Sequence, residues 1–142
     1  LRDNVSLSLM EKVVENKSDF DNINIFEISK CFKGFDSSKN VIEKTSLALV
    51  KASYTKTDEK LYTELASEII SLVNHFKNQN VSFETAEFCA FAHPIHNSKI
   101  FINSECVGEL FVINPNVSLK IETFLAPRQS DSKLLSTFDS IK

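Results

Sequence analysis

The sequence contains few glycines, arginines and prolines: its 142 residues include two Gly, two Arg and three Pro, and no Trp. The two glycines, Gly34 and Gly108, are too far apart to form a glycine-rich phosphate loop, so that kind of nucleotide site is excluded. Arginines are the usual bidentate clamps for phosphates, and Arg2 and Arg128 lie near the two ends of the chain. Nucleotide chemistry that depends on glycine loops or arginine forks is therefore not expected.

Long apolar runs and an excess of positive charge are also missing. No apolar run approaches the ~20 residues that a membrane-spanning helix needs, so no membrane association is expected. The formal net charge of −3 excludes a global basic field that would hold nucleic acid. A hydrophobic content of 42% and a charged content of 25% are typical of a globular domain. We expect a single domain over residues 1–142, as a fragment of a longer chain, because the sequence begins without Met.

The three cysteines, Cys31, Cys89 and Cys106, are an odd number and widely spaced. This pattern suits reduced thiols better than a disulfide framework, and it favours a cytoplasmic protein. We interpret the three thiols as small buried apolar side chains.

One cluster of residues could bind a metal. Cys89, His93, His96 and Cys106 supply four donors of the kind that tetrahedral zinc uses. Their spacing, C-x3-H-x2-H-x9-C, contains no C-x2-C knuckle, so buried thiols and loop histidines are the preferred interpretation and no metal site is assigned. A Cys–His nucleophile pair among the same residues would need a lowered thiol pKa and a third orienting group.

Apolar residues at helical spacing predict two helices. The first is a helix of about three turns, and the second covers about residues 58–78. The apolar stripe of the first helix consists of Val5, Leu9 and Val13. The stripe of the second consists of Leu61, Leu65, Ile69, Leu72, Val73 and Phe76. The candidate N-caps are Asp3 or Asn4 for the first helix and Thr57 or Asp58 for the second.

Segments rich in β-branched and aromatic residues predict strands between and after these helices. The predicted strands cover residues 23–32, 45–54, 81–91, 99–103, 106–113 and 117–125. Phe26 is expected to be buried in the first strand. Residues 93–98 are predicted to form a loop around Pro94, and residues 127–142 a short helix or a frayed tail. The order of elements predicts an α+β fold, a mainly antiparallel sheet with helices on one face.

Two segments resemble the beta subunit of phenylalanyl-tRNA synthetase. LRDNVSLSLM (residues 1–10) and FEISKCF (residues 26–32) are similar to that family's L-R-x-S-L-L-P-x-L-L helix and F-E-I-G-x-x-F strand. HPIHNSKI (residues 93–100) and GELFVINP (residues 108–115) are similar to its H-P-G-R-x-A-x-I segment and its G-x-x-G-x-L-H-P hairpin. The segments occur in the family's order, with the long helix between them.

The resemblance implies a class II aminoacyl-tRNA synthetase-like fold and a non-catalytic domain that supports the alpha subunit, which charges tRNA with phenylalanine using ATP. It implies a heterotetramer in which ATP, magnesium and tRNA belong to the parent complex, so no catalytic or cofactor-binding residue is expected here. It places the opening helix and strand where class II folds keep their dimer interface, which makes Leu7, Met10 and Val14 candidates for interface or core positions. An independent protein-interaction module, or a zinc or thiol protein, remains an alternative.

Overall fold

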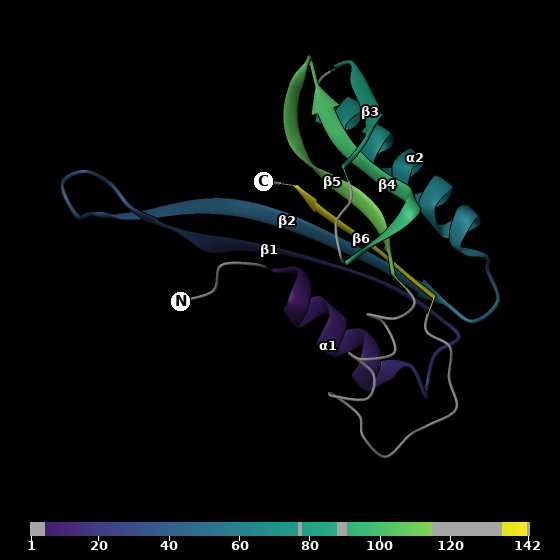
Figure 1. The fold of residues 1–142 in the computed structure, drawn as a ribbon. Helices are drawn as coiled ribbons and strands as arrows, with labels where there is room; N and C mark the ends of the chain where they lie inside the picture. Colours follow the sequence, from purple (N-terminus) through teal and green to yellow (C-terminus); the bar gives the residue numbers. More distant parts are fainter. Residues whose placement is uncertain (1–4, 77, 88–90, 115–134, 142) are drawn as a thin grey trace.

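The computed structural model describes residues 5–76, 78–87, 91–114 and 135–141, the last range by its backbone alone (Figure 1). Two helices and six strands make up this part of the chain. In chain order they are α1 (Ser6–Asn16), β1 (Asn22–Phe35), β2 (Val41–Ser53), α2 (Asp58–Phe76), β3 (Val81–Thr85), β4 (Ala92–Ile102), β5 (Glu105–Ile113) and β6 (Leu135–Ile141).

The six strands form one sheet in the order β1-β2-β6-β5-β4-β3, and every neighbouring pair is antiparallel. The predicted α+β class with a mainly antiparallel sheet is therefore confirmed. β6 comes last in the chain but lies between β2 and β5, so it joins the β1–β2 hairpin to the β3–β4–β5 part of the sheet (Figure 1).

The segment 135–141 corrects the prediction of a short helix or a frayed tail for residues 127–142. The local sequence is polar with a weak helical stripe, whereas the strand depends on pairing with both neighbours, which a local pattern does not encode. Residues 127–134 and residue 142 lie outside the described part of the chain, as does the strand predicted over residues 117–125.

The two helices pack on opposite faces of the sheet, although the sequence predicted helices on one face. Successive side chains of a strand point to opposite faces. In β2, Ala48 and Val50 lie in the core cluster that contains Leu9 of α1. Leu49 packs against the cluster of α2, and Lys51 forms ion pairs with carboxylates of that helix. The central part of the sheet is therefore covered on both sides.

Helix α1 forms where the apolar spacing predicts it. Leu9 and Val13 are buried against the sheet, as a stripe facing a core should be. The residue that precedes the helix is Val5, which makes no side-chain cap hydrogen bond. The predicted caps Asp3 and Asn4 lie outside the described residues.

Helix α2 begins as predicted and buries only part of its predicted stripe. Thr57 Oγ1 accepts a hydrogen bond of 3.2 Å from the backbone N–H of Lys60, so Thr57 is the N-cap. Phe76 is 77% exposed, which shows that the apolar contact ends before the helix does. The fully buried residues of the stripe are Leu61, Leu65 and Ile69. Neither described helix is long and apolar enough to cross a membrane.

The β4–β5 hairpin turns between the strands predicted over residues 99–103 and 106–113. Asn103 and Ser104 have φ angles of 49° and 70°, the left-handed conformation that a two-residue hairpin turn requires. The loop predicted for residues 93–98 is wrong, since this segment lies in β4. A register shift between Ala92 and Asn97 accommodates Pro94, which cannot donate to a regular ladder.

The β1–β2 hairpin is longer than the sequence predicts. Its strands pair from Asn22↔Ser53 to Phe35↔Val41, with one register shift between Phe32 and Gly34. Gly34 has φ 118°, a conformation that favours glycine over other residues. The bulge lets pairing continue toward the turn, where the sequence predicts the strand to have ended. β3, in contrast, is shorter than the strand predicted over residues 81–91.

Phe26 is 69% exposed, so its predicted burial is wrong. The face of β1 that packs against α1 contains Ile23, Ile25 and Cys31. Phe26 points to the other face, where α2 covers Leu49 of the neighbouring strand but does not cover β1.

We expect Ile100→Ala to lower the free energy of unfolding by about 2–5 kcal/mol, because Ile100 is fully buried and truncation leaves a cavity. Phe26→Ala should cost less than about 1 kcal/mol, the scale of surface substitutions. Urea unfolding of the two variants measures both values. Equal losses would contradict the assignment of Phe26 to an exposed face.

Candidate protein-binding interface

An exposed apolar stripe runs along one face of the β1–β2 hairpin. Phe26 pairs with Leu49 and Ile28 pairs with Leu47, so these side chains share the face that α2 covers nearer the centre of the sheet. We define the hairpin stripe as the residues of this face that α2 leaves open. They are Phe26, Ile28, Phe32, Phe35, Val41 and Leu47.

The stripe has the size of the apolar core of a protein interface. Phe26, Ile28, Phe35 and Val41 each expose half or more of their surface. Together they expose on the order of 400 Å² of apolar area, since one aromatic side chain accounts for about 150–250 Å². A standard interface buries about 800 Å² on each partner, of which a central part is apolar. The stripe could supply that part.

The charges within the stripe balance each other. Lys30 Nζ lies 3.6 Å from Glu43 Oε2, on the same face as the apolar side chains. A neutral apolar surface is typical of protein contacts, whereas nucleic acid requires a surplus of positive charge.

The stripe borders an edge of the sheet. β1 is the first strand in the sheet order, and within the described residues nothing pairs with its outer edge over 14 residues. A long edge strand offers a row of unpaired N–H and C=O groups to another chain. The apolar face and the open edge therefore occur together.

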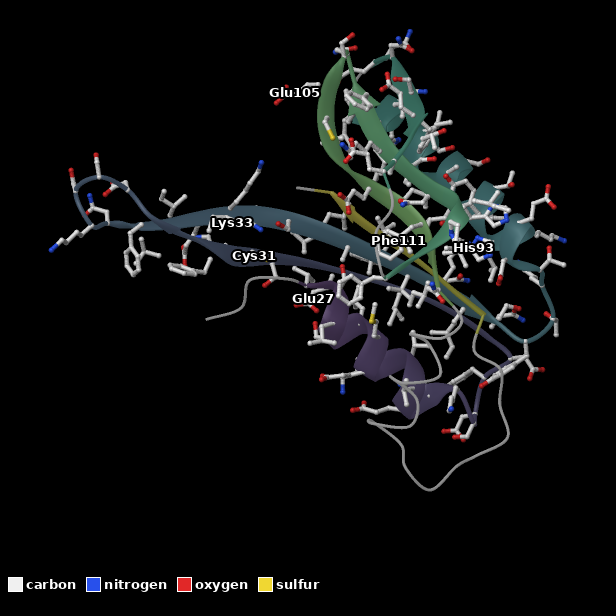
Figure 2. All side chains as sticks on the ribbon, in the orientation of Figure 1. Glu27, Cys31, Lys33, His93, Glu105 and Phe111 are labelled. Carbon is white, nitrogen blue, oxygen red and sulfur yellow. The ribbon has the colours of Figure 1, made fainter. Side chains whose placement is uncertain are left out.

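The interface candidates in α1 occupy three different environments. Leu7 is exposed, Met10 is half-buried against the core cluster, and Val14 is buried. Ser8 Oγ lies 3.2 Å from Glu27 Oε2, which joins α1 to β1 (Figure 2). Leu7 is thus available to a partner, while Val14 positions the helix that carries it.

The residues considered for zinc do not converge in the described part of the chain. His93 and His96 are neighbours, with ring centroids 5.2 Å apart. Cys106 is in β5 next to the hairpin turn, opposite Phe101, and is therefore several residues along β4 from His96. Cys89 lies outside the described residues. Within the ranges described, no three His, Cys, Asp or Glu side chains group as metal ligands do.

The two histidines lie beside α2. The ring of His96 is 5.4 Å from that of Tyr62, centroid to centroid, and the Tyr62 hydroxyl forms a hydrogen bond with the hydroxyl of Ser98. His93 Nδ1 accepts a hydrogen bond of 3.2 Å from the backbone N–H of Ile95. The contacts of Tyr62 with His96 and Ser98 join the helix to β4.

A buried lysine joins α2 to the centre of the sheet. Lys51 Nζ lies 2.6 Å from Glu68 Oε1 and 3.7 Å from Glu64 Oε2. Lys56 Nζ donates to both carboxylate oxygens of Glu64, at 2.9 and 3.0 Å. These hydrogen bonds hold the pKa of the Glu64 carboxyl below its ordinary value. The charged groups satisfy one another, as a buried charge requires.

With this geometry in place, the comparisons with known proteins identify the family. Residues 1–123 match the family model described as the phenylalanyl tRNA synthetase beta chain CLM domain. The chain belongs to this family. The predicted relationship to phenylalanyl-tRNA synthetase is therefore confirmed.

A solved structure supports the fold of this CLM domain. The chain is similar to a pyrrolysyl tRNA synthetase, PylSc, of Desulfitobacterium hafniense, with a TM-score of 0.69 and 15% sequence identity. The match covers 99% of this chain and 46% of that chain, so the CLM domain spans less than half of this synthetase. The predicted class II synthetase-like fold is confirmed. No curated protein matches the chain significantly.

The sequence prediction missed the hairpin stripe. The signal was present in Ile25, Phe26 and Ile28, which place apolar side chains on both faces of one strand. Apolar side chains on both faces of a strand are typical of sheets that are covered on both sides. The pattern does not say whether the second cover comes from the same chain or from another.

Replacing Glu64 by Gln should change the pH dependence of stability. Because the folded-state pKa of Glu64 is lowered, its ionised form stabilises the fold above its ordinary value of 4.5. This contribution, at most about 1 kcal/mol for a partly exposed pair, is lost as the pH falls through the folded-state pKa.

Urea unfolding at pH 7 and at pH 3 measures this effect. Glu64→Gln should be less stable than the wild type at pH 7, and the difference should be smaller at pH 3. Glu11→Gln, on the exposed side of α1, is the matched control and should show no such convergence. A pH-independent difference for Glu64→Gln would contradict the assignment.

Proposed function

We propose that this CLM domain is a non-catalytic structural domain of the phenylalanyl-tRNA synthetase beta chain. It binds and supports the alpha subunit, which attaches phenylalanine to its tRNA with ATP in the cytoplasm. The observation that carries the proposal is the hairpin stripe beside the open edge of β1, in a chain that belongs to this family. The two features suit a surface that another subunit covers.

The composition of the chain supports a non-catalytic role. Arginine side chains are the strongest clamps for phosphate groups, and Arg2 and Arg128 are the two arginines of the sequence. His96 stands where the resembled H-P-G-R segment has arginine. The buried cation of the sheet, Lys51, is neutralised by Glu64 and Glu68. ATP, magnesium and tRNA then belong to the parent heterotetramer.

The partner in this proposal covers the edge of β1 from both sides. Phe26 and Ile28 lie on the face away from α1, and the exposed Leu7 lies on α1. Leu7 then contributes at the rim of the interface. Met10 and Val14 pack the helix against the sheet, and they therefore hold in place the helix that carries Leu7.

A charge at the centre of the stripe should weaken assembly with the alpha subunit. Ile28→Asp should weaken binding at least about 30-fold, because the complex would bury an unpaired carboxylate. Ile95→Asp, at an exposed position of β4, is the matched control and should bind as the wild type does. Sizing chromatography and titration with the alpha subunit from the same source measure both.

Neither ATP nor phenylalanine should stabilise this domain. A ligand that binds only the folded state stabilises it by RT ln(1 + [L]/Kd), and this raises the melting temperature. We expect no change at millimolar ligand in thermal unfolding followed by circular dichroism. A rise of several degrees with either ligand would show a retained active site and would overturn the non-catalytic assignment.

A further inference from the structure

The outer part of the β1–β2 hairpin, residues 30–45, extends past both helices into solvent. In Figure 1 the two strands and their turn project to the left of α1 and of the rest of the sheet. Every residue from Phe35 to Thr45 is exposed. Apart from Cys31, which is buried in the core cluster of α1, this part of the chain packs little against either core, yet it is a regular two-stranded ribbon.

The outer hairpin carries apolar side chains on both of its faces. Phe35 and Val41 form a cross-strand pair on the face of the hairpin stripe. Ile42 is the next residue along β2 and therefore points to the opposite face. The Phe35 ring also packs edge-on against that of Phe32, with centroids 5.3 Å apart. A ribbon that is apolar on both faces is suited to a cleft rather than to a flat surface.

The turn at the end of the hairpin is held in one shape. The Asp36 carboxylate accepts hydrogen bonds from the backbone N–H groups of Ser38 and Asn40, at 2.9 and 2.8 Å. The Asn40 side chain donates a third, at 3.0 Å. These bonds, led by the one from the Asn40 backbone, lower the pKa of Asp36. An element that is ordered before binding loses less conformational entropy when it binds.

The outer hairpin differs from the rest of the chain in charge. It contains four lysines and two carboxylates, a net charge of 4 − 2 = +2, while the remaining residues carry 12 − 17 = −5. Lys30 is paired with Glu43, and Asp36 is engaged in the turn. Lys39 and Lys44 are exposed residues near the apolar end. A partner surface with carboxylates would match this charge.

We propose that the outer hairpin inserts into an apolar cleft rimmed by carboxylates on the alpha subunit. This inference rests on the proposed function and names the chemistry of the partner surface. Phe35, Val41 and Ile42 fill the cleft, and the lysines meet its acidic rim. A protein cleft fits better than RNA because Ile42 adds an apolar side chain on the face opposite Phe35 and Val41, whereas single-stranded RNA binding uses a cationic groove with aromatic side chains on which bases stack.

The first test removes the apolar anchor. The full-length beta chain with Phe35→Ser is titrated with the alpha subunit from the same source, and the dissociation constant is compared with that of the wild type. We expect at least tenfold weaker binding. Phe76→Ser, at the exposed end of α2, is the matched control and should bind normally. Both side chains are exposed, so both variants should keep the melting temperature of the wild type.

The second test removes the charge. The double variant Lys39→Gln, Lys44→Gln should associate several-fold more slowly and with a weaker dependence on salt, while its dissociation rate stays close to that of the wild type. Lys60→Gln, an exposed lysine of α2, should leave the association rate unchanged.

Three results would overturn the inference. If the wild type forms the complex and the Phe35 and lysine variants bind as tightly and as fast, the hairpin is not a contact, although the proposed function stands. If the wild type forms no complex, the proposed function fails and the inference fails with it. If the lysine variant assembles normally but the complex binds tRNA more weakly, the outer hairpin belongs to an RNA site.

Discussion

The alternation of side chains along β2 is the constraint on which the rest of the structure depends. Ala48, Val50 and Ala52 are buried under α1, while Leu49 and Lys51 face α2. A shift of one residue in this register would exchange the two sets and expose the core. Both helices, both core clusters and the ion pairs of Lys51 therefore depend on the register of one strand.

The same alternation explains why the hairpin has an open face. Each helix covers the strands only where its own apolar stripe lies, and α2 reaches Leu49 but not Phe26. The β1–β2 ladder continues past both helices because its hydrogen bonds do not need a packed face. In the proposed complex, the alpha subunit covers the apolar residues of this extension.

The elements that follow from local rules could be predicted from the sequence. Leu9 and Val13 have the spacing of one helix face, and Thr57 has the side-chain oxygen that a helix start requires. The turn at Asn103 follows from short-range chemistry in the same way. Phe26 and β6 could not be predicted, because their environments depend on what lies beside them in the sheet.

The candidate site shows the same limit. The sequence suggested Leu7, Met10 and Val14 as interface residues, and the structure separates the exposed Leu7 from the buried Val14. It also suggested that Cys106 could act with His93 and His96. Cys106 lies opposite Phe101, which is several residues along β4 from His96. In the sequence, Ile28 is one apolar residue of an apolar strand. It is exposed because α2 covers Leu49 of the neighbouring strand and does not extend over β1.

The position of β6 has a consequence for the synthesis of the chain. Leu47 pairs with Ile141, 94 residues further along, so the strand that joins the two parts of the sheet is made after all the others. The β1–β2 hairpin and the β3–β4–β5 meander can form on the ribosome while β2 and β5 still have bare edges. Pairing over such distances is slow, since a long loop must close first. Newly made chains therefore pass through a stage in which four strand edges are unpaired and prone to aggregation. Pairing of β6 with the edges of β2 and β5 ends that stage.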